Sequence, residues 1–433
     1  MIRRKFIKQS SIAGLAITQP FSNIIIPVKE RKFRTVLIGA GWWGNNILGE
    51  AMASGSSEIV GICDVDEQFL ATTAERVEKS MGNRPKKYID YRDLLNDLKP
   101  EISIIATPEH WHALQAIEAL KTGCHVYMEK PIAHTINEGK TIVAAKKKYG
   151  KVVQVGLHRR TSPHILKGQE MLRSGEVGEV KVIKACVYSP TANEIVHPLP
   201  EPPQNLHWDL YLGPASYQPY EPTVHPRGFR KYLNFTNGTI GDWGVHWMDQ
   251  ILWWAEEKFP KKIYSTGGMV NPDCGFDAPD FQTATIEFDN FIVEWEHRRL
   301  GGDKSERSPV GTYFYGTKGV LFMGFFDGTI FYPNDKDQSP IHIEHGMHAP
   351  DGQNIRELWA NFIEAIEGKK TPVAGIESSY RATTTSLLAM IAYKTGRQIY
   401  WDGEKEMILD DTEAQSLMQR EYRAPWVYPE INL

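Results

Sequence analysis

The sequence lacks several features that would each indicate a particular class of protein. No apolar run is long enough to cross a bilayer, so we expect no membrane-spanning helix. Basic and acidic residues nearly balance, 49 against 53, and the net charge of −4 gives no electrostatic reason to expect nucleic-acid binding. We find no internal repeat and no low-complexity tract. At 433 residues, 41% of them hydrophobic, the chain has enough material for two domains with ample cores.

Cysteine is also scarce, and its spacing argues against a redox motif or a cysteine metal site. The four cysteines, none of them in a C-x-x-C pair, are Cys63, Cys124, Cys186 and Cys274. Buried free thiols are therefore expected. His110 and His112 form a His-x-His pair, but no third ligand lies nearby in the sequence, so we predict no metal site.

The first part of the chain alternates short apolar segments with amphipathic ones. The apolar segments predict strands at Thr35–Ile38, Glu58–Cys63, Ile102–Ala106, Val126–Met128 and Val152–Val155. The amphipathic segments predict helices at Trp43–Ser54, Asp66–Lys79, Trp111–Lys121 and Ile136–Tyr149. Strands that are apolar on both faces are typical of a parallel sheet covered by helices. The fold class predicted here is α/β, a doubly wound Rossmann domain.

A glycine-rich segment, Gly39–Gly44, has the spacing G-x-G-x-x-G and lies between the first predicted strand and a helix. These glycines permit a tight turn, close approach of a pyrophosphate and packing of the helix on the sheet. The second strand ends in Asp64, 20 positions after Gly44, where an acid binds the ribose hydroxyls. An aspartate there repels a 2′-phosphate, and Val65-Asp66 brings no arginine, so we predict NAD rather than NADP.

After Gly156 the pattern changes to strand-like alternation. It predicts a mostly antiparallel, open sheet with strands at Val180–Tyr188, Ile263–Gly268, Gln282–Phe288, Phe291–His297, Thr312–Gly316 and Gly319–Phe325. Two helices are predicted near Ile355–Glu367 and Tyr380–Thr395. The irregular segment His197–Gly241 is rich in proline, glycine and aromatic residues, and such long loops are usually functional. We therefore predict a second, α+β domain.

Three further motifs carry groups suited to chemistry. Lys130 follows the fourth predicted strand in Glu129-Lys130-Pro131, and Thr107-Pro108 with His112 follows the third. Asp242 and His246 are four residues apart, which predicts one helix face on which the carboxylate orients the imidazole as a base. The alternative is a helix cap beside a buried structural histidine.

In this order the motifs resemble the Gfo/Idh/MocA oxidoreductase family, which includes glucose–fructose oxidoreductase and inositol dehydrogenase. The resemblance implies that Lys130 and His246, with Asp242, are catalytic and also bind substrate. Arg159 is a further candidate for substrate binding, because it lies where the second domain begins at the cleft. For Arg159 a ligand contact and an interdomain ion pair are both open. The residues implied to bind NAD are Gly39, Gly41, Trp42, Trp43, Gly44, Asp64, Thr107, Pro108, His112, Glu129 and Lys130.

The predicted organisation has three parts: a leader and linker at 1–30, the dinucleotide-binding domain at 31–156 and a substrate-binding and oligomerisation domain at 157–433. The leader contains Arg3-Arg4, followed by a short apolar run at Ile12–Ile17. This pattern is similar to a twin-arginine export signal. We therefore expect export to the periplasm, or a cytoplasmic protein if this segment is only a basic tail. The C-terminal sheet is expected to form a homodimer or homotetramer.

These observations favour an NAD-dependent oxidoreductase that acts on a secondary hydroxyl of a sugar, polyol or glycoside. Because free NAD is scarce outside the cytoplasm, an exported enzyme would keep its cofactor bound and recycle it. An NAD-dependent glycoside hydrolase, working by transient oxidation at C3 and elimination, is the alternative. A non-catalytic sugar sensor is less favoured, because the chain retains both Lys130 and His246.

Overall fold

The computed structural model describes residues 31–190, 199, 201–256, 259–301, 308–347 and 353–430. The predicted leader at 1–30 lies outside the described residues, and so do positions 197, 198 and 200 of the predicted irregular segment. In the described ranges, no helix has both the length and the hydropathy needed to cross a membrane.

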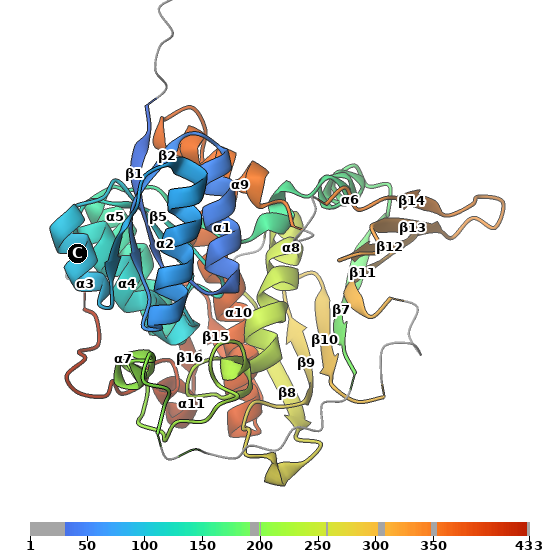
Figure 1. The fold of residues 1–433 in the computed structure, drawn as a ribbon. Helices are drawn as coiled ribbons and strands as arrows, with labels where there is room; N and C mark the ends of the chain where they lie inside the picture. Colours follow the sequence, from blue (N-terminus) through green and yellow to red (C-terminus); the bar gives the residue numbers. More distant parts are fainter. Residues whose placement is uncertain are drawn as a thin grey trace, which may run out of the picture. The chain divides into compact units, whose positions relative to one another are not determined.

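The first sheet, of which Figure 1 labels β1, β2 and β5, has six parallel strands in the order β3-β2-β1-β4-β5-β6. The strands are β1 (Phe33–Ile38), β2 (Ser57–Cys63), β3 (Lys86–Tyr88), β4 (Ile102–Ile105), β5 (His125–Met128) and β6 (Val153–Val155). This order, which reverses between β1 and β4, is the doubly wound arrangement predicted from the apolar strands. Only the short, polar β3 was not predicted.

The helices of this sheet begin and end at recognisable capping residues. They are α1 (Trp42–Ala53), α2 (Glu67–Met81), α3 (Tyr91–Leu98), α4 (His112–Lys121) and α5 (Ile136–Tyr149). Thr135 and Glu138 form a reciprocal capping box at the start of α5, and Gly150 ends that helix in the left-handed conformation. The predicted helices are confirmed, while α3 was missed.

The second sheet has ten strands in the order β14-β13-β12-β11-β7-β10-β9-β8-β15-β16. Every neighbouring pair is antiparallel except β7 with β10, which confirms the mostly antiparallel prediction. The bounds are β7 (Val180–Tyr188), β8 (Lys262–Gly268), β9 (Phe281–Glu287), β10 (Ile292–Arg298), β11 (Val310–Gly316), β12 (Gly319–Gly324), β13 (Thr329–Pro333), β14 (Ile341–Ile343), β15 (Ile399–Asp402) and β16 (Met407–Leu409).

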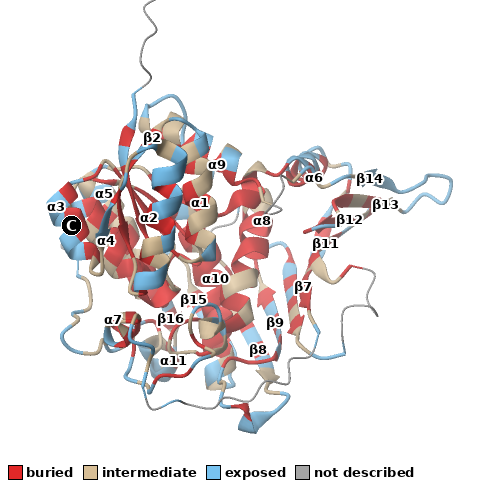
Figure 2. Cartoon of the chain, viewed as in Figure 1, coloured by how far each residue is buried: buried red, intermediate tan, exposed pale blue. Residues whose placement is uncertain are grey.

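Side chains in the central strands of this sheet alternate between buried and exposed. Val293 and Trp295 of β10 are buried, whereas Ile292 and Glu294 are exposed. Such alternation is expected when one face of an antiparallel sheet packs on the core and the other faces solvent. Figure 2 shows the buried residues concentrated in the central strands and the adjoining helices.

Helix α10 joins the two sheets. Helix α10 (Ile376–Thr395) contacts α5 of the first sheet, strand β8 of the second sheet and helix α8 (Val245–Ala255). One continuous apolar core therefore runs through both parts, within a single compact unit from Lys32 to Leu433. The domain boundary at residue 156 remains a prediction. The other helices are α6 (Pro163–Arg173), α7 (Trp208–Leu212), α9 (Ile355–Ile366) and α11 (Thr412–Ser416).

The predicted irregular segment has a small apolar core of its own, which includes Trp208, Tyr211 and Phe235. It is attached to the first sheet through the turn between β2 and α2. The amide of Glu67 donates to the carbonyl of Asn205, and the amide of His207 donates to the carbonyl of Val65. This segment, residues 201–236, is called the insert below.

Candidate active site

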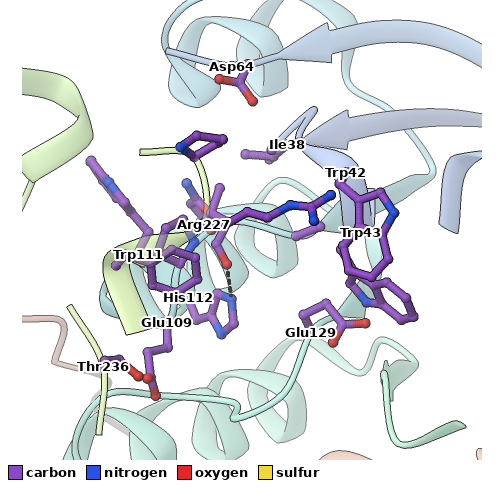
Figure 3. A pocket seen from close by; sticks show the side chains of 18 of the residues that line it. Ile38, Trp42, Trp43, Asp64, Glu109, Trp111, His112, Glu129, Arg227 and Thr236 are labelled. Carbon is purple, nitrogen blue, oxygen red and sulfur yellow. Dashed lines mark hydrogen bonds between the residues drawn. The ribbon is translucent and has the colours of Figure 1, made fainter. Parts of the chain in front are cut away.

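A cavity of about 460 Å³ lies at the carboxyl ends of the parallel strands and is closed on its other side by the insert and by α8. It extends from Asp64, at the end of β2, to Asp242 and His246 of the second part of the chain. The end of an open parallel sheet where strand order reverses is where such folds bind ligands. Figure 3 shows part of the lining, with Asp64 at one end and Glu109 and Glu129 at the other.

The glycine turn between β1 and α1 leaves room for a ligand at one position only. Gly39 has a φ of +93°, and a Cβ there would lie 2.7 Å from the carbonyl carbon of Ala106. A Cβ at Gly44 would lie 2.0 Å from the carbonyl oxygen of Gly39. A Cβ at Gly41, by contrast, would meet nothing within 4 Å. Gly41 therefore borders open space at the start of α1, where a pyrophosphate fits.

Asp64 lies at the end of β2, as predicted, and helps to fix the glycine turn. Its Oδ2 accepts a hydrogen bond from the amide of Ala40 at 2.6 Å, and its Oδ1 accepts one from the amide of Asp66 at 2.8 Å. Burial raises the pKa of this carboxyl to about 6, although the two backbone donors lower it. Two of the four lone-pair positions of the carboxylate remain for ribose hydroxyls.

The insert covers this end of the cavity. Nε2 of His225 lies 2.9 Å from Oδ2 of Asp66. The guanidinium of Arg227 lies 4.6 Å from the ring centroid of Trp42, and Figure 3 shows this side chain crossing the cavity toward that ring. A dinucleotide bound along Gly41 and Asp64 would therefore lie beneath side chains of the insert.

His112 connects the two loops that border the centre of the cavity. Its Nδ1 lies 2.8 Å from the carbonyl oxygen of Pro131, and its Nε2 lies 2.9 Å from that of Thr107. Thr107 also donates through Oγ1 to Gln115 at 2.6 Å. Thr107, Pro108 and His112 all line the cavity. His112 thus holds the Lys130-Pro131 turn against the Thr107-Pro108 turn.

Lys130 and Asp242, 112 residues apart, meet at the inner end of the cavity. The ammonium of Lys130 donates to Oδ1 of Asp242 at 2.6 Å and to its carbonyl oxygen at 2.9 Å. Arg230 of the insert donates from Nε to Oδ2 at 3.0 Å. Burial opposes ionisation of this carboxyl, but Lys130 and Arg230 outweigh it and hold the pKa of Asp242 well below its usual range. Asp242 therefore stays ionised.

His246 lies on α8, lines the same cavity and is buried. Its ring centroid is 5.2 Å from that of His158, and its Nδ1 has no hydrogen-bond partner among the described residues. Burial, with the nearby Arg159, Lys130 and His158, holds the pKa of His246 well below its ordinary value, so the ring is neutral at pH 7.

The predicted pairing of Asp242 with His246 is wrong. Both carboxylate oxygens are bound by Lys130 and Arg230, because an ammonium and a guanidinium form stronger charge-assisted hydrogen bonds than a neutral imidazole does. The chain around Asp242 also forms a π-helical turn, Ile240–Gly244, before α8 begins. Such turns are frequent at functional sites. Asp242 instead orients the ammonium of Lys130.

Arg159 and Arg160 follow β6 and differ sharply in their partners. Arg160 forms the ion pair, with Nε at 2.8 Å and Nη2 at 2.7 Å from the carboxylate oxygens of Asp249. Arg159 is buried and lines the cavity, and no carboxylate of the described chain forms a salt bridge with it. Two roles were predicted for Arg159, a ligand contact and an interdomain ion pair. The ion pair is therefore wrong for the described part of the chain.

Two buried glutamates border the cavity with raised pKa values. Burial raises the pKa of Glu109 and of Glu129 to about 7. Oε1 of Glu109 accepts from the amide of Asn237 at 3.0 Å, and Oε2 of Glu129 accepts from the amide of Lys130 at 3.2 Å. A Cβ at Gly156 would lie 2.1 Å from Glu129, so this glycine makes room for the carboxyl. Glu129 supports the backbone of Lys130.

The structure thus brings every predicted site residue to one cavity except Gly44, which is buried behind the glycine turn. Sequence reasoning missed the contacts of Glu109 and Trp426 with this site, since their partners are distant in sequence, and it also missed the bond of Arg230 to Asp242. The four cysteines are buried and free, as expected. Across the described ranges, no group of three potential metal ligands is found.

Comparison with known proteins identifies the family. Residues 33–157 match the Gfo/Idh/MocA oxidoreductase family model for the NAD-binding Rossmann fold, and residues 191–428 match the model for its C-terminal alpha/beta domain. The chain therefore belongs to the Gfo/Idh/MocA family of oxidoreductases and has an NAD-binding domain.

Named relatives differ in activity. The chain is 22% identical to the D-glucoside 3-dehydrogenase of Escherichia coli, over 80% of this chain and 91% of that protein. It is 29% identical to glycosyl hydrolase family 109 protein 1 of Akkermansia muciniphila over 156 residues, which span only about a third of each protein. The WlbA dehydrogenase structure from Chromobacterium violaceum, a complex with NADH and UDP-GlcNAcA, has the same fold, with a TM-score of 0.65, 19% identity and coverage of 88% of this chain and 99% of that one.

Proposed function

We propose that this protein oxidises a secondary hydroxyl of a sugar, polyol or glycoside. The observation that carries the proposal is the position of Lys130 and His246 at one end of the cavity whose other end has the glycine turn and Asp64. Similarity to a D-glucoside 3-dehydrogenase supports a carbohydrate as the substrate class.

Lys130 is suited to bind the reacting oxygen. An ammonium has three N–H donors, and two of them are bound by the carboxylate and the carbonyl of Asp242. The third is available to a substrate hydroxyl. Because Asp242 fixes the ammonium, this donor is preorganised to stabilise negative charge as it develops on the oxygen.

His246 is suited to take the hydroxyl proton. Its ring lines the cavity and is neutral at pH 7, so one of its two nitrogens carries a lone pair that can accept a proton. Bound NAD, held by Gly41 and Asp64, would supply the hydride acceptor.

The test is product analysis with purified protein over a panel of sugars, polyols and aryl glycosides. A keto-sugar product, with reduced cofactor or a reduced second sugar in equal amount, is expected. Absence of turnover on every member, by protein that has bound NAD, would refute the proposal.

A second candidate, an NAD-dependent glycoside hydrolase, is favoured by the similarity to glycosyl hydrolase family 109 proteins. In this mechanism, oxidation at C3 makes the C2 proton acidic enough for elimination of the aglycone. Aryl glycosides separate the two functions, since a hydrolase releases the phenol without net change in the cofactor. An oxidoreductase instead gives the intact 3-keto glycoside.

Export and assembly are further parts of the proposal. The Arg3-Arg4 pair would direct export, so replacing both by lysine should leave the protein in the cytoplasm, as cell fractionation would detect.

The exposed Tyr264, Ile292 and Tyr315 on the ten-stranded sheet support a homo-oligomer formed through that sheet. Light scattering that compares the molar mass of Tyr264→Lys with that of wild type tests the oligomeric state. We expect a smaller mass for the variant.

A further inference from the structure

Arg159 is a buried cation for which the described protein supplies no carboxylate partner. Its guanidinium lies among three aromatic rings, 4.8 Å from the centroid of Trp247, 4.6 Å from Phe325 and 5.6 Å from Trp243. Its one hydrogen bond within the described chain runs from Nη1 to Nε2 of His158 at 3.3 Å. Its Nε has no partner there.

Such an arrangement is unusual, because buried charges are normally paired. The neighbouring Arg160 shows the normal arrangement, with a bidentate pair to Asp249. Burial lowers the pKa of Arg159 to about 9, which still leaves the side chain charged at pH 7. The stacked rings restrict the guanidinium and stabilise its charge only in part. Arg159 lines the cavity, and its guanidinium has five N–H donors, of which the described chain binds one.

The charges around Arg159 also favour an anion. Lys130, Arg159 and Arg230 are cations at this end of the cavity, and among the described carboxyls that line it here, only Asp242 has a pKa that is held low. The pKa values of the other two acids, Glu109 and Glu129, are raised to about 7, so each is substantially protonated. A neutral carbohydrate would leave this end with excess positive charge.

We infer that the substrate carries a carboxylate, as in a uronic or aldonic acid or one of its glycosides, and that Arg159 binds it. The planar guanidinium has paired N–H donors that match a carboxylate in two parallel hydrogen bonds. Arg159 would then determine specificity, while Lys130 and His246 act on the hydroxyl. This inference rests on the proposed function and names its substrate class.

The test compares matched substrates that differ in one group. Methyl glucoside, methyl glucuronide, the methyl ester of the glucuronide and methyl glucoside 6-phosphate form one series, and glucose with gluconate forms a second. The expected result is a kcat/KM for a carboxylate at least tenfold above those of its neutral counterparts in one series. In Arg159→Met this ratio should fall roughly 10- to 100-fold, the range expected for a lost hydrogen bond to a charged group.

Two further variants define the role of the residue. Arg159→Lys keeps the positive charge but lacks the paired N–H donors of the guanidinium. Its ratio of kcat/KM for the acid to kcat/KM for the neutral sugar should lie between those of wild type and Arg159→Met. Arg84→Met removes an exposed arginine, paired only with Glu78, and should leave the ratio unchanged. The melting temperature of Arg159→Met should not fall, since no protein carboxylate loses a partner. Three results would each overturn the inference. They are equal kcat/KM values for acids and neutral sugars, a preference of the wild type for the phosphate, and a preference for acids that persists in Arg159→Met.

A binding measurement separates this inference from the proposed function. Calorimetry would follow binding of glucuronide or gluconate to the NADH-loaded protein, for wild type and Arg159→Met. Acid binding that is lost in the variant supports the inference even if no sugar is turned over, a result that would count against the oxidoreductase proposal alone. Turnover of neutral sugars without any acid binding would support the proposed function and overturn the inference.

Discussion

At the scale of single residues, the ion pair between Lys130 and Asp242 is the feature that most constrains the chemistry. Lys130→Met keeps a long side chain but removes the donor to the substrate oxygen, and His246→Ala removes the proposed base. Each should lower kcat by roughly a hundredfold or more, as for loss of an acid–base group or a charge-stabilising donor. Steady-state kinetics on the substrate found in the panel measures this.

The His246→Ala variant also provides the control. NAD affinity, measured by calorimetry, should stay close to that of wild type, because Gly41 and Asp64 lie at the other end of the cavity. The melting temperature separates a chemical effect from misfolding. A folded, NAD-bound His246→Ala protein with nearly full activity would show that the proton goes to another group.

Asp64 is the residue expected to determine the preference for NAD over NADP. Its carboxylate should accept the ribose hydroxyls of NAD and repel the 2′-phosphate of NADP, so we expect NAD to bind at least tenfold more tightly. Asp64→Asn keeps an oxygen that accepts from an amide, such as that of Ala40, yet removes the charge. The preference for NAD, measured as the ratio of the NAD affinity to the NADP affinity, should therefore be smaller in this variant. Tighter binding of NADP to wild type, by calorimetry, would contradict the assignment.

At the scale of structural elements, the turn between β1 and α1 allows a sharper test. Gly44→Ala places a Cβ against the backbone oxygen of Gly39, which cannot move aside, so both stability and NAD binding should be lost. Gly41→Ala places its Cβ in open space. The unliganded Gly41→Ala protein should keep its melting temperature but bind NAD at least tenfold more weakly. Wild-type affinity in Gly41→Ala would mean that the pyrophosphate does not lie at this turn.

Most elements with a local apolar pattern were predicted from the sequence, whereas elements that depend on pairing with distant residues were not. Five strands of the first sheet lie in short apolar segments, whereas β3 (Lys86–Tyr88) does not and is held by its pairing with β2. Helices α3 and α6 each bury an apolar face, with Leu94, Leu95 and Leu98 in α3 and Ile165, Met171 and Leu172 in α6, yet neither was predicted. The parallel pairing of β7 with β10 depends on residues over 100 positions apart, which local patterns do not report.

The same limit applies within the site. The glycine turn, Asp64 and Lys130 are local motifs, so the sequence located them correctly. The partner of Asp242 was misjudged because spacing along a helix points to His246, while the actual partner lies 112 residues away. Trp426, which packs against Trp111 at the edge of the cavity, comes from the far end of the chain without any local signal.

At the scale of the whole molecule, buried histidines make stability depend on pH. Burial lowers the pKa of seven of them: His110 (to about 3), His112, His134, His158, His164 (to about 4), His246 and His297 (to about 4). Below pH 6.5 the unfolded chain takes up protons that the folded protein does not. Each such proton lowers the free energy of unfolding by roughly 1.4 kcal/mol per pH unit.

Four carboxyls act in the opposite direction, and one of them is Asp277, whose pKa is raised by burial. Burial raises the pKa of Asp64 to about 6 and those of Glu109 and Glu129 to about 7, so the folded protein binds these protons first and gains stability as the pH falls toward 4. The histidines outnumber them, so the free energy of unfolding should fall between pH 6.5 and 4.5. Urea unfolding across this range, on NAD-free protein, measures the trend. Because His246→Gln removes one of the contributing histidines, its stability should decline less steeply than that of wild type. A free energy of unfolding that stays constant or rises toward pH 4.5 would show that the histidines are not held neutral in the folded protein.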